Sequence, residues 1–267
     1  MLNRLFYTRY VPSGAKAVVL QKTSVLKKVR PLHAGTEVAV TKAAHSAAMT
    51  SGLFYVPCVI RQELDTGTIE LERITGLVTF REIFETGAEN LDLLHRAGRA
   101  LAYTHTHLKL PETLKFRVPL DWECENKDFV CLHGDFNINN VCYQQEHDRL
   151  VVLDWASAGV LSRGNTVGSR YFDLGKFLRS LLCQQCHLLD SIGNFDKRAF
   201  AFLEGYQQQL GRKLDCHLVR KYLLKMVTRR VRIQLCRKQL RRAFGNSVAY
   251  VILRVLSAKW QQLEMKE

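Results

Sequence analysis

The sequence has 267 residues, of which 47% are hydrophobic and 24% are charged. This composition is ordinary for a globular protein and excludes the polar, highly charged signature of a disordered chain. The net charge is +14, and most of the excess follows Gly211, where 15 Lys and Arg residues accompany 3 Asp and Glu residues. A segment this basic can attract a nucleic acid, an anionic membrane surface or an acidic substrate, and charge alone does not choose among them.

A chain of this length can form one large core or two small lobes. No apolar run reaches the roughly 18 residues of a membrane helix, and Arg4 and Arg9 interrupt the first residues, so we expect neither a membrane span nor a signal peptide. Eight cysteines spread over the chain do not make the dense framework of a small secreted domain. We therefore expect reduced thiols and a cytoplasmic location.

The first third of the sequence predicts short strands and turns with one helix. An alanine-rich segment suggests a helix that has Thr36 as its cap and ends near Gly52. The segment 74–76 is the expected crossing into a second lobe. Four segments have the β-branched or alternating pattern of strands: 16–21, 24–29, 56–62 and 68–73.

Helices predominate from Thr79 onward. Residues 90–108 place apolar side chains at helical spacing, and Pro111 stops this helix. Two strand-like segments, 129–132 and 150–153, interrupt the helical pattern before it resumes after Tyr171. The sequence therefore predicts an α+β protein with a β-rich beginning and a larger helical remainder.

Three polar residues stand beside these two apolar strands. Asp135 follows the first strand, Asn140 comes five residues later, and Asp154 ends the second strand. Carboxylate and amide oxygens are the ligands that Mg²⁺ accepts together with phosphate, a set that Asn140 and Asp154 can supply. Asp135 is then left to accept the proton of an attacking hydroxyl. The alternative is two solvent-facing turns without a ligand, because Asp and Asn are common in turns whether or not they bind a metal.

The segment His133-Gly134-Asp135, with Asn140 and then Asp154-Trp155, resembles the catalytic loop and metal-binding Asp of kinases. The His-Gly-Asp form is similar to that of the aminoglycoside phosphotransferase and choline kinase-like family. The resemblance implies a bilobal protein-kinase-like fold, ATP and Mg²⁺ as cofactors, Asp135 as catalytic base, and Asn140 and Asp154 as metal ligands. It makes His133 a supporting member of the loop.

The resemblance extends upstream into the predicted strands. Residues 25–29 are similar to the strand that carries the phosphate-binding lysine. Lys27 is favoured for this role and Lys28 is the rival, because alternate residues of a strand face opposite sides. Glu37 is the natural partner on the following helix. The alternative is an exposed strand lysine and a glutamate that stabilises the first turn of the helix.

The same resemblance assigns a hinge and a supporting aspartate. Residues 71–76 resemble the hinge whose backbone holds adenine, so Glu72 and Ile74 are nucleotide-binding candidates. Asp173 resembles the family's aspartate that braces the catalytic loop, with a simple helix cap as the alternative. The implied lobes are 1–76, with the nucleotide-binding strands, and 77–267, with the catalytic loop and the basic helices.

We therefore expect an ATP-dependent phosphotransferase with an alcohol group as acceptor. The basic C-terminal region disfavours a polycationic antibiotic and fits better an anionic sugar, a lipopolysaccharide-core hydroxyl or a small metabolite as acceptor. A cationic amphipathic helix over 229–242 suggests peripheral contact with the inner face of an anionic membrane, or nothing beyond solubility. Its sparse aromatic residues poorly support single-stranded nucleic acid as a partner.

Two rival functions remain. The turn at 11–15 has a single glycine, which favours a pseudokinase-like module that only binds an anionic partner through its basic helices. Retention of Asp135, Asn140 and Asp154 opposes it. A protein kinase is disfavoured because the segment between Asp154 and Asp173 is short and has no Ala-Pro-Glu sequence.

Overall fold

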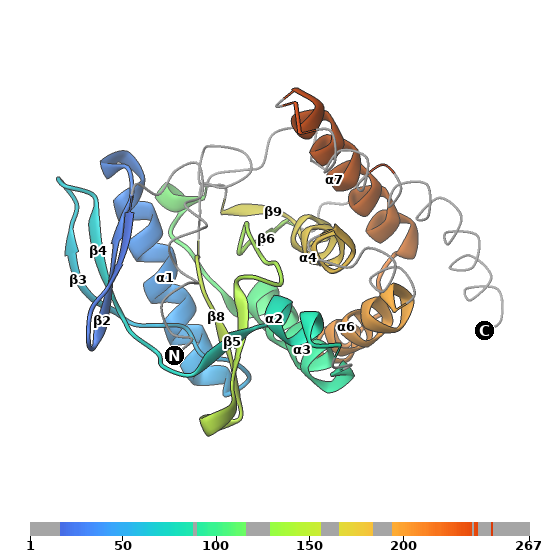
Figure 1. Ribbon diagram of the computed structural model, residues 1–267, viewed down its shortest axis with the longest axis horizontal. Coiled ribbons are helices and arrows are strands. Elements are labelled where there is room, and N and C mark those ends of the chain that lie inside the picture. Colours follow the sequence, from blue (N-terminus) through green and yellow to red (C-terminus); the bar gives the residue numbers. More distant parts are fainter. Residues whose placement is uncertain are drawn as a thin grey trace. The chain divides into compact units, whose positions relative to one another are not determined.

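The chain forms two compact units of an α+β protein, as the sequence predicts (Figure 1). The first unit comprises 1–78, 103–135 and 140–170, and the second comprises 79–102, 136–139 and 171–267. The computed structural model describes residues 17–87, 90–115, 129–155, 166–183, 194–236, 238, 239 and 247. The predicted turn at 11–15 and nearly all of the basic segment beyond Cys236 lie outside these residues. The lobe boundary at residues 76 and 77 stays a prediction.

A four-stranded antiparallel sheet in the order β1-β2-β4-β3 begins the first unit. Its strands are β1 (Ala17–Leu20), β2 (Ser24–Lys28), β3 (Val59–Glu63) and β4 (Thr68–Glu72). Each overlaps a segment whose side-chain pattern predicts a strand. The turn into β4 needs Gly67, which has a φ of 69° and approaches the carbonyl of Val29 so closely that a Cβ would stand 2.2 Å from it.

Helix α1 (Pro31–Ser51) packs on this sheet (Figure 1). Its contact with the sheet is an apolar cluster that includes Val38 of the helix and Ile69 of β4. The expected cap at Thr36 is wrong, because the helix already begins at Pro31, whose fixed φ suits the first helical position. The expected end is confirmed, since Gly52 has a φ of 63° and its N–H bonds to the carbonyl of Ala48.

Two smaller sheets complete the strands. One has the order β5-β7-β8 and the other pairs β6 with β9. Their bounds are β5 (Leu77–Thr79), β6 (Phe129–Cys131), β7 (Val141–Gln144), β8 (Arg149–Val152) and β9 (Val167–Ser169), and two short 3₁₀ turns span Glu112–Leu114 and Gln145–His147. β6 and β8 were predicted, whereas β5, β7 and β9 were not. β7 and β8 form a hairpin, which places Asn140 before one strand and Asp154 after the other.

Helices build the second unit. They are α2 (Phe80–Glu85), most of α3 (Leu91–His107), α4 (Tyr171–Cys183), α6 (Phe195–Leu210) and α7 (Cys216–Cys236). A capping box between Thr79 and Glu82 starts α2. The backbones of helices α3 and α6 approach closely at Gly98, which has no side chain. A Cβ added there would stand 2.0 Å from the carbonyl oxygen of Phe202.

The short segment 136–139 belongs to this helical unit. The ring of Phe136 lies 5.3 Å from that of Phe177, between ring centroids. The N–H of Ile138 donates to the Ser180 hydroxyl at 3.1 Å, and its carbonyl accepts from the N–H of Arg81 at 3.0 Å. Helix α4 therefore fixes the backbone between Asp135 and Asn140.

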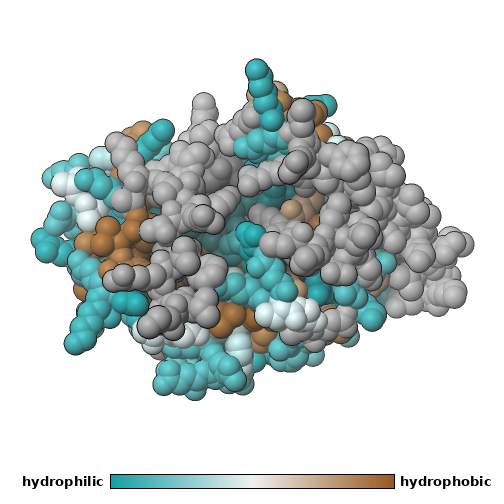
Figure 2. Space-filling model, viewed as in Figure 1, coloured by the Kyte–Doolittle hydropathy of each residue, from teal (hydrophilic) through white to brown (hydrophobic). Residues whose placement is uncertain are grey.

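Among the coloured residues of Figure 2, hydrophilic ones predominate, and one group of hydrophobic residues lies on the side of the four-stranded sheet. Exposed apolar side chains of that sheet include Val19 on β1 and Ile60 on β3, its two edge strands. Among the described helices, none is both long and apolar enough to cross a bilayer.

Candidate active site

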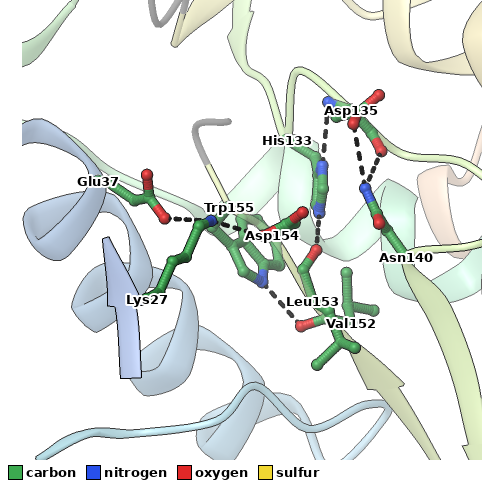
Figure 3. Close-up of polar contacts among 9 residues, drawn as sticks. All are labelled: Lys27, Glu37, His133, Asp135, Asn140, Val152, Leu153, Asp154 and Trp155. Carbon is green, nitrogen blue, oxygen red and sulfur yellow. Dashed lines mark hydrogen bonds and ion pairs between the residues drawn. The ribbon is translucent and has the colours of Figure 1, made fainter. Parts of the chain in front are cut away.

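Lys27 is the centre of a buried ion cluster in the first unit (Figure 3). Its Nζ lies 2.5 Å from Glu37 Oε1 and 2.5 Å from Asp154 Oδ1, and the residue is 7% exposed. The next residue, Lys28, is exposed because it points to the other side of β2. The structure thus brings Lys27, and not Lys28, to the carboxylates that α1 and the end of β8 supply.

The cluster is electrostatically tight. Burial disfavours the charge on Lys27, but the carboxylates of Asp154 and Glu37 outweigh it, so the pKa of Lys27 lies above its ordinary value. Burial raises the pKa of Glu37, and Lys27 offsets only part of that effect. Glu37 is the seventh residue of α1, so it lies beyond the first turn in which a glutamate would stabilise the helix dipole. Its ion pair with Lys27 accounts for its position instead.

Asp154 follows β8 in a left-handed backbone conformation, with a φ of 63°. Such a φ is uncommon for any residue other than glycine and is retained where the surroundings enforce it. Two backbone hydrogen bonds hold the chain just before it: Leu153 N–H donates to the Asn140 carbonyl at 2.8 Å, and Val152 N–H donates to the Tyr55 carbonyl at 2.9 Å. The unusual turn directs the carboxylate of Asp154 to Lys27 (Figure 3).

Trp155 locks this turn from the other side. It is 2% exposed, and its indole N–H donates to the Val152 carbonyl at 3.0 Å. Its ring packs 4.6 Å from that of His133 and 6.3 Å from that of Phe54, between centroids. The sequence identified Trp155 only through the Asp-Trp form of the family's motif. A large aromatic residue directly after Asp154 could have indicated that it packs against the site.

His133 joins the two polar turns of the site. The N–H of Asp135 donates to His133 Nδ1 at 3.1 Å, so this nitrogen is an acceptor. Nε2 must then carry the proton, which it donates to the Leu153 carbonyl at 2.9 Å. The neutral imidazole is completely buried and binds the backbone on either side. Gly134, with a φ of 81°, makes the tight turn between His133 and Asp135 possible.

Asp135 and Asn140 face each other across the loop (Figure 3). Asn140 Nδ2 donates to the Asp135 carbonyl at 2.9 Å and to Asp135 Oδ2 at 3.2 Å. These contacts use the NH₂ side of the amide and orient the Asp135 carboxylate. They leave the amide oxygen of Asn140 on the side away from Asp135.

Asn140 and Asp154 carry the kinds of oxygen atom that bind Mg²⁺. They follow one another around the open end of one hairpin, where Val141 pairs with Val152. Mg²⁺ commonly takes one or two protein oxygens and completes its shell with phosphate and water. Within the described part of the chain, no three His, Cys, Asp or Glu side chains converge as metal ligands.

The predicted hinge is braced by side chains of the first unit. Glu72 Oε2 accepts from the Tyr55 hydroxyl at 2.7 Å, and the N–H of Glu72 donates to the Cys58 carbonyl at 2.9 Å. Burial and the hydrogen bond to Glu72 raise the pKa of Tyr55 to about 12. Gln144 Nε2 donates to the Thr75 carbonyl at 2.9 Å. Glu72 is therefore engaged within the sheet.

Ile74 is the remaining hinge candidate. Its backbone N–H and carbonyl make no hydrogen bond to any described residue.

Asp173 lies in the first turn of α4, in the helical unit, and is completely buried. The contacts of the ion cluster and the loop thus join Lys27, Glu37 and Asp154, and separately His133, Asp135 and Asn140. Neither set includes Glu72 or Ile74.

Comparison with known proteins identifies the architecture. No protein-family model matches the sequence, and no curated protein sequence matches it. A choline/ethanolamine kinase family protein from Mesorhizobium loti matches with a TM-score of 0.59 over 94% of this chain and 89% of its own, at 15% identity. A glucosamine kinase matches with a TM-score of 0.62 over 91% of this chain and 77% of its own, at 13% identity.

A choline kinase from Streptococcus pneumoniae matches with a TM-score of 0.57 over 91% of this chain and 95% of its own, at 12% identity. The chain has the protein-kinase-like fold. The family resemblance seen in the sequence is thereby confirmed at the level of the fold. In the first unit of this fold, Lys27 lies on a strand and Glu37 on a helix, and His133, Asp135, Asn140 and Asp154 lie in turns.

Proposed function

We propose that the chain is an ATP-dependent phosphotransferase that moves the γ-phosphate to a hydroxyl of a small molecule. The observation that carries the proposal is the arrangement of Lys27, Glu37 and Asp154 in one buried cluster, beside a loop that pairs Asp135 with Asn140. If Lys27 were an exposed strand lysine and the aspartates belonged to unrelated solvent-facing turns, these charged side chains would not be buried together.

Lys27 would bind the phosphates of the nucleotide. A lysine that is buried between two carboxylates stays protonated, as its raised pKa indicates, and its position is fixed before the nucleotide arrives. Glu37 holds the ammonium group from α1, so that Lys27 can turn from Asp154 toward a phosphate without losing its second partner. This division of roles explains why one lysine has two acidic neighbours.

Asp135 would orient the acceptor hydroxyl and take its proton at a carboxylate oxygen. Asn140 fixes the carboxylate through Oδ2, and His133 fixes the backbone of Asp135 by accepting its N–H. Positioning of this kind is most of what a protein contributes to phosphoryl transfer. His133 remains a neutral structural residue in this scheme.

Asn140 and Asp154 would hold magnesium through their side-chain oxygens, and the backbone of Ile74 would hold adenine. When bound, ATP with Mg²⁺ supplies the phosphoryl group and the charge neutralisation that the transfer needs. The left-handed turn at Asp154, locked by Trp155, keeps the carboxylate pointed into the site. Asp173 would support the loop from α4.

The acceptor is proposed by chemical class. The similar solved structures are described as kinases of choline or ethanolamine and of glucosamine, all small molecules with a hydroxyl group. The excess positive charge of this chain favours an anionic member of that class, such as a sugar phosphate or a lipopolysaccharide-core sugar. A basic C-terminal segment also suits peripheral contact with an anionic membrane.

A panel of acceptors tests the proposal. ATP consumption would be measured with choline, ethanolamine, glucosamine and anionic sugar phosphates, for the natural chain and for Asp135→Asn. We expect one class to raise turnover above the rate with water, and Asp135→Asn to lower it by about 10² to 10⁴ with little change in ATP affinity. Full turnover by Asp135→Asn would remove Asp135 as the base.

The pseudokinase-like binding module is the second candidate. Its support is the single glycine at 11–15, from which a phosphate-covering loop that is reduced or built differently is expected. This module would bind ATP, or an anionic partner at its basic helices, without turning over nucleotide. Saturable ATP binding with no phosphate transfer to any acceptor class would favour it over the enzyme.

A further inference from the structure

Gln144 ends strand β7 and contacts the predicted hinge, within the first unit. It is 3% exposed, so both ends of its side-chain amide need partners in the protein. Nε2 donates to the Thr75 carbonyl at 2.9 Å, and Oε1 accepts from Arg149 Nε at 2.7 Å. Gln144 therefore joins the residue after Ile74 to the hairpin of β7 and β8.

The chemistry of its two partners fixes the direction of this amide. A guanidinium group has only donors and a backbone carbonyl only accepts, so the oxygen of Gln144 must face Arg149 and its NH₂ group must face Thr75. Arg149 is held in turn, because its guanidinium carbon lies 4.0 Å from the centre of the Tyr55 ring. The amide of Gln144 therefore cannot turn round without losing both of its hydrogen bonds.

Other contacts hold the hinge on the opposite side of Ile74. The Tyr55 hydroxyl donates to Glu72 Oε2 at 2.7 Å, and the N–H of Arg73 donates to the Thr23 carbonyl at 3.1 Å. The chain that leaves the hinge enters β5, which pairs with β7. The hinge is thus fixed both before and after Ile74, the residue proposed to hold adenine.

The hairpin that Gln144 belongs to also carries the two proposed metal ligands. Asn140 directly precedes β7, and Asp154 follows the end of β8 by two residues. The N–H of Leu153 donates to the Asn140 carbonyl at 2.8 Å and closes this open end of the hairpin. Gln144 lies four residues from Asn140, which is about 13 Å along an extended strand. One hairpin therefore has the hinge contact near its turn and the metal ligands at its open end.

We propose that Gln144 is a positioning residue for the nucleotide, which holds the adenine-binding backbone of the hinge in register with the metal ligands. This inference rests on the proposed function of Ile74, Asn140 and Asp154. A hinge that is already held in place need not be ordered when adenine binds, so its contribution to affinity is not spent on ordering. Gln144 thus acts on binding of the base, through the Thr75 carbonyl, and not on binding of the phosphates.

Calorimetric titration with two ligands tests this role. ATP carries the base and the phosphates, whereas tripolyphosphate carries the phosphates alone, and both are titrated with Mg²⁺ into the full chain. Gln144→Met keeps the length of the side chain and removes the donor to Thr75. We expect this variant to bind ATP more weakly by about fivefold or more, because the hinge must then be ordered on binding. Its binding of tripolyphosphate should be unchanged.

Two controls separate positioning from a general loss of structure. Tyr143→Phe removes a hydrogen bond to Asp148 from the neighbouring residue of β7, without touching the hinge, and should bind ATP like the natural chain. Lys27→Met removes the proposed phosphate-binding cation and should weaken binding of both ligands.

Gln144→Glu replaces Gln144→Met if the latter does not fold. Its carboxylate still accepts from Arg149, so the hairpin keeps that contact, but an ionised carboxylate cannot donate to the Thr75 carbonyl. We expect the same selective loss of ATP binding at pH 8 and 0.15 M salt, where the added charge is largely screened from phosphates at the open end of the hairpin.

The outcomes distinguish the positioning role from the proposed function. A natural chain that does not bind ATP contradicts the proposed function, and the positioning role with it. The positioning role alone is overturned if the natural chain binds ATP and the Gln144 variant binds it equally well. It is also overturned if that variant loses ATP and tripolyphosphate to the same extent, or if Tyr143→Phe weakens ATP binding as much.

Discussion

Replacing Lys27 with Met isolates the electrostatics of the buried cluster. Methionine keeps the length and apolar stem of lysine but removes the charge that Glu37 and Asp154 share. The side chain of Glu37 is only 10% exposed, so it cannot recover the lost partner from water. We expect Glu37 to become protonated in the folded variant, because burial already raises its pKa in the presence of Lys27.

The cost of this protonation sets the size of the effect. Each pH unit above the ordinary pKa of a glutamic acid costs about 1.4 kcal/mol, so holding Glu37 protonated at pH 7 costs roughly 3 to 4 kcal/mol. At pH 5 the same cost is about 1 kcal/mol. A carboxyl group with a raised pKa in the folded protein stabilises the fold below its ordinary pKa and loses that contribution as the pH rises. Lys27→Met should therefore be most destabilised at neutral pH.

Urea unfolding at pH 5 and pH 7 measures this difference directly. The natural chain, Lys27→Met and the double variant Lys27→Met/Glu37→Gln are compared at both values. We expect the double variant to recover most of the stability that the single variant loses at pH 7. A loss that is equal at both pH values, or no recovery in the double variant, would show that burial of Glu37 is not the source of the effect.

Two other sites give stability predictions. Trp155→Phe keeps the aromatic ring but removes the N–H that binds the Val152 carbonyl, and should lower the free energy of unfolding by about 1 to 2 kcal/mol in urea unfolding. An unchanged value would mean that the indole bond does not hold the turn. Gly98→Ala forces a Cβ against the Phe202 backbone and should lower the free energy of unfolding by about 1 to 3 kcal/mol. Its control is Gly35→Ala, at an uncrowded position of α1, which should raise it by about 0.5 to 1 kcal/mol.

The sequence predicted most of the elements that local pattern determines. The four strands of the first sheet and the long helix up to His107 follow from side-chain alternation and helical spacing. The start of α1 was misplaced because Thr36 resembles a cap, whereas Pro31 provides a stronger start through its fixed φ. β5, β7 and β9 were missed because, unlike the segments of β6 and β8, none of them has four consecutive apolar residues, so their partners rather than their own pattern define them.

Part of the site could be located from sequence and part could not. Motif spacing placed Asp135, Asn140 and Asp154 on neighbouring strand ends, and strand alternation favoured Lys27 over Lys28. The left-handed turn at Asp154 and the bracing of the hinge depend on contacts between residues far apart in the chain. No local pattern encodes such contacts.

Calorimetric titration of ATP, with and without Mg²⁺, tests the central claim most directly. It is performed on the natural chain and on Asp154→Asn, which keeps the shape of the side chain and removes its charge. We predict that Mg²⁺ strengthens ATP binding to the natural chain, and that Asp154→Asn weakens binding of the magnesium complex by about tenfold or more. Absence of ATP binding, or binding that neither Mg²⁺ nor Asp154→Asn changes, would contradict a nucleotide site built around Lys27 and Asp154.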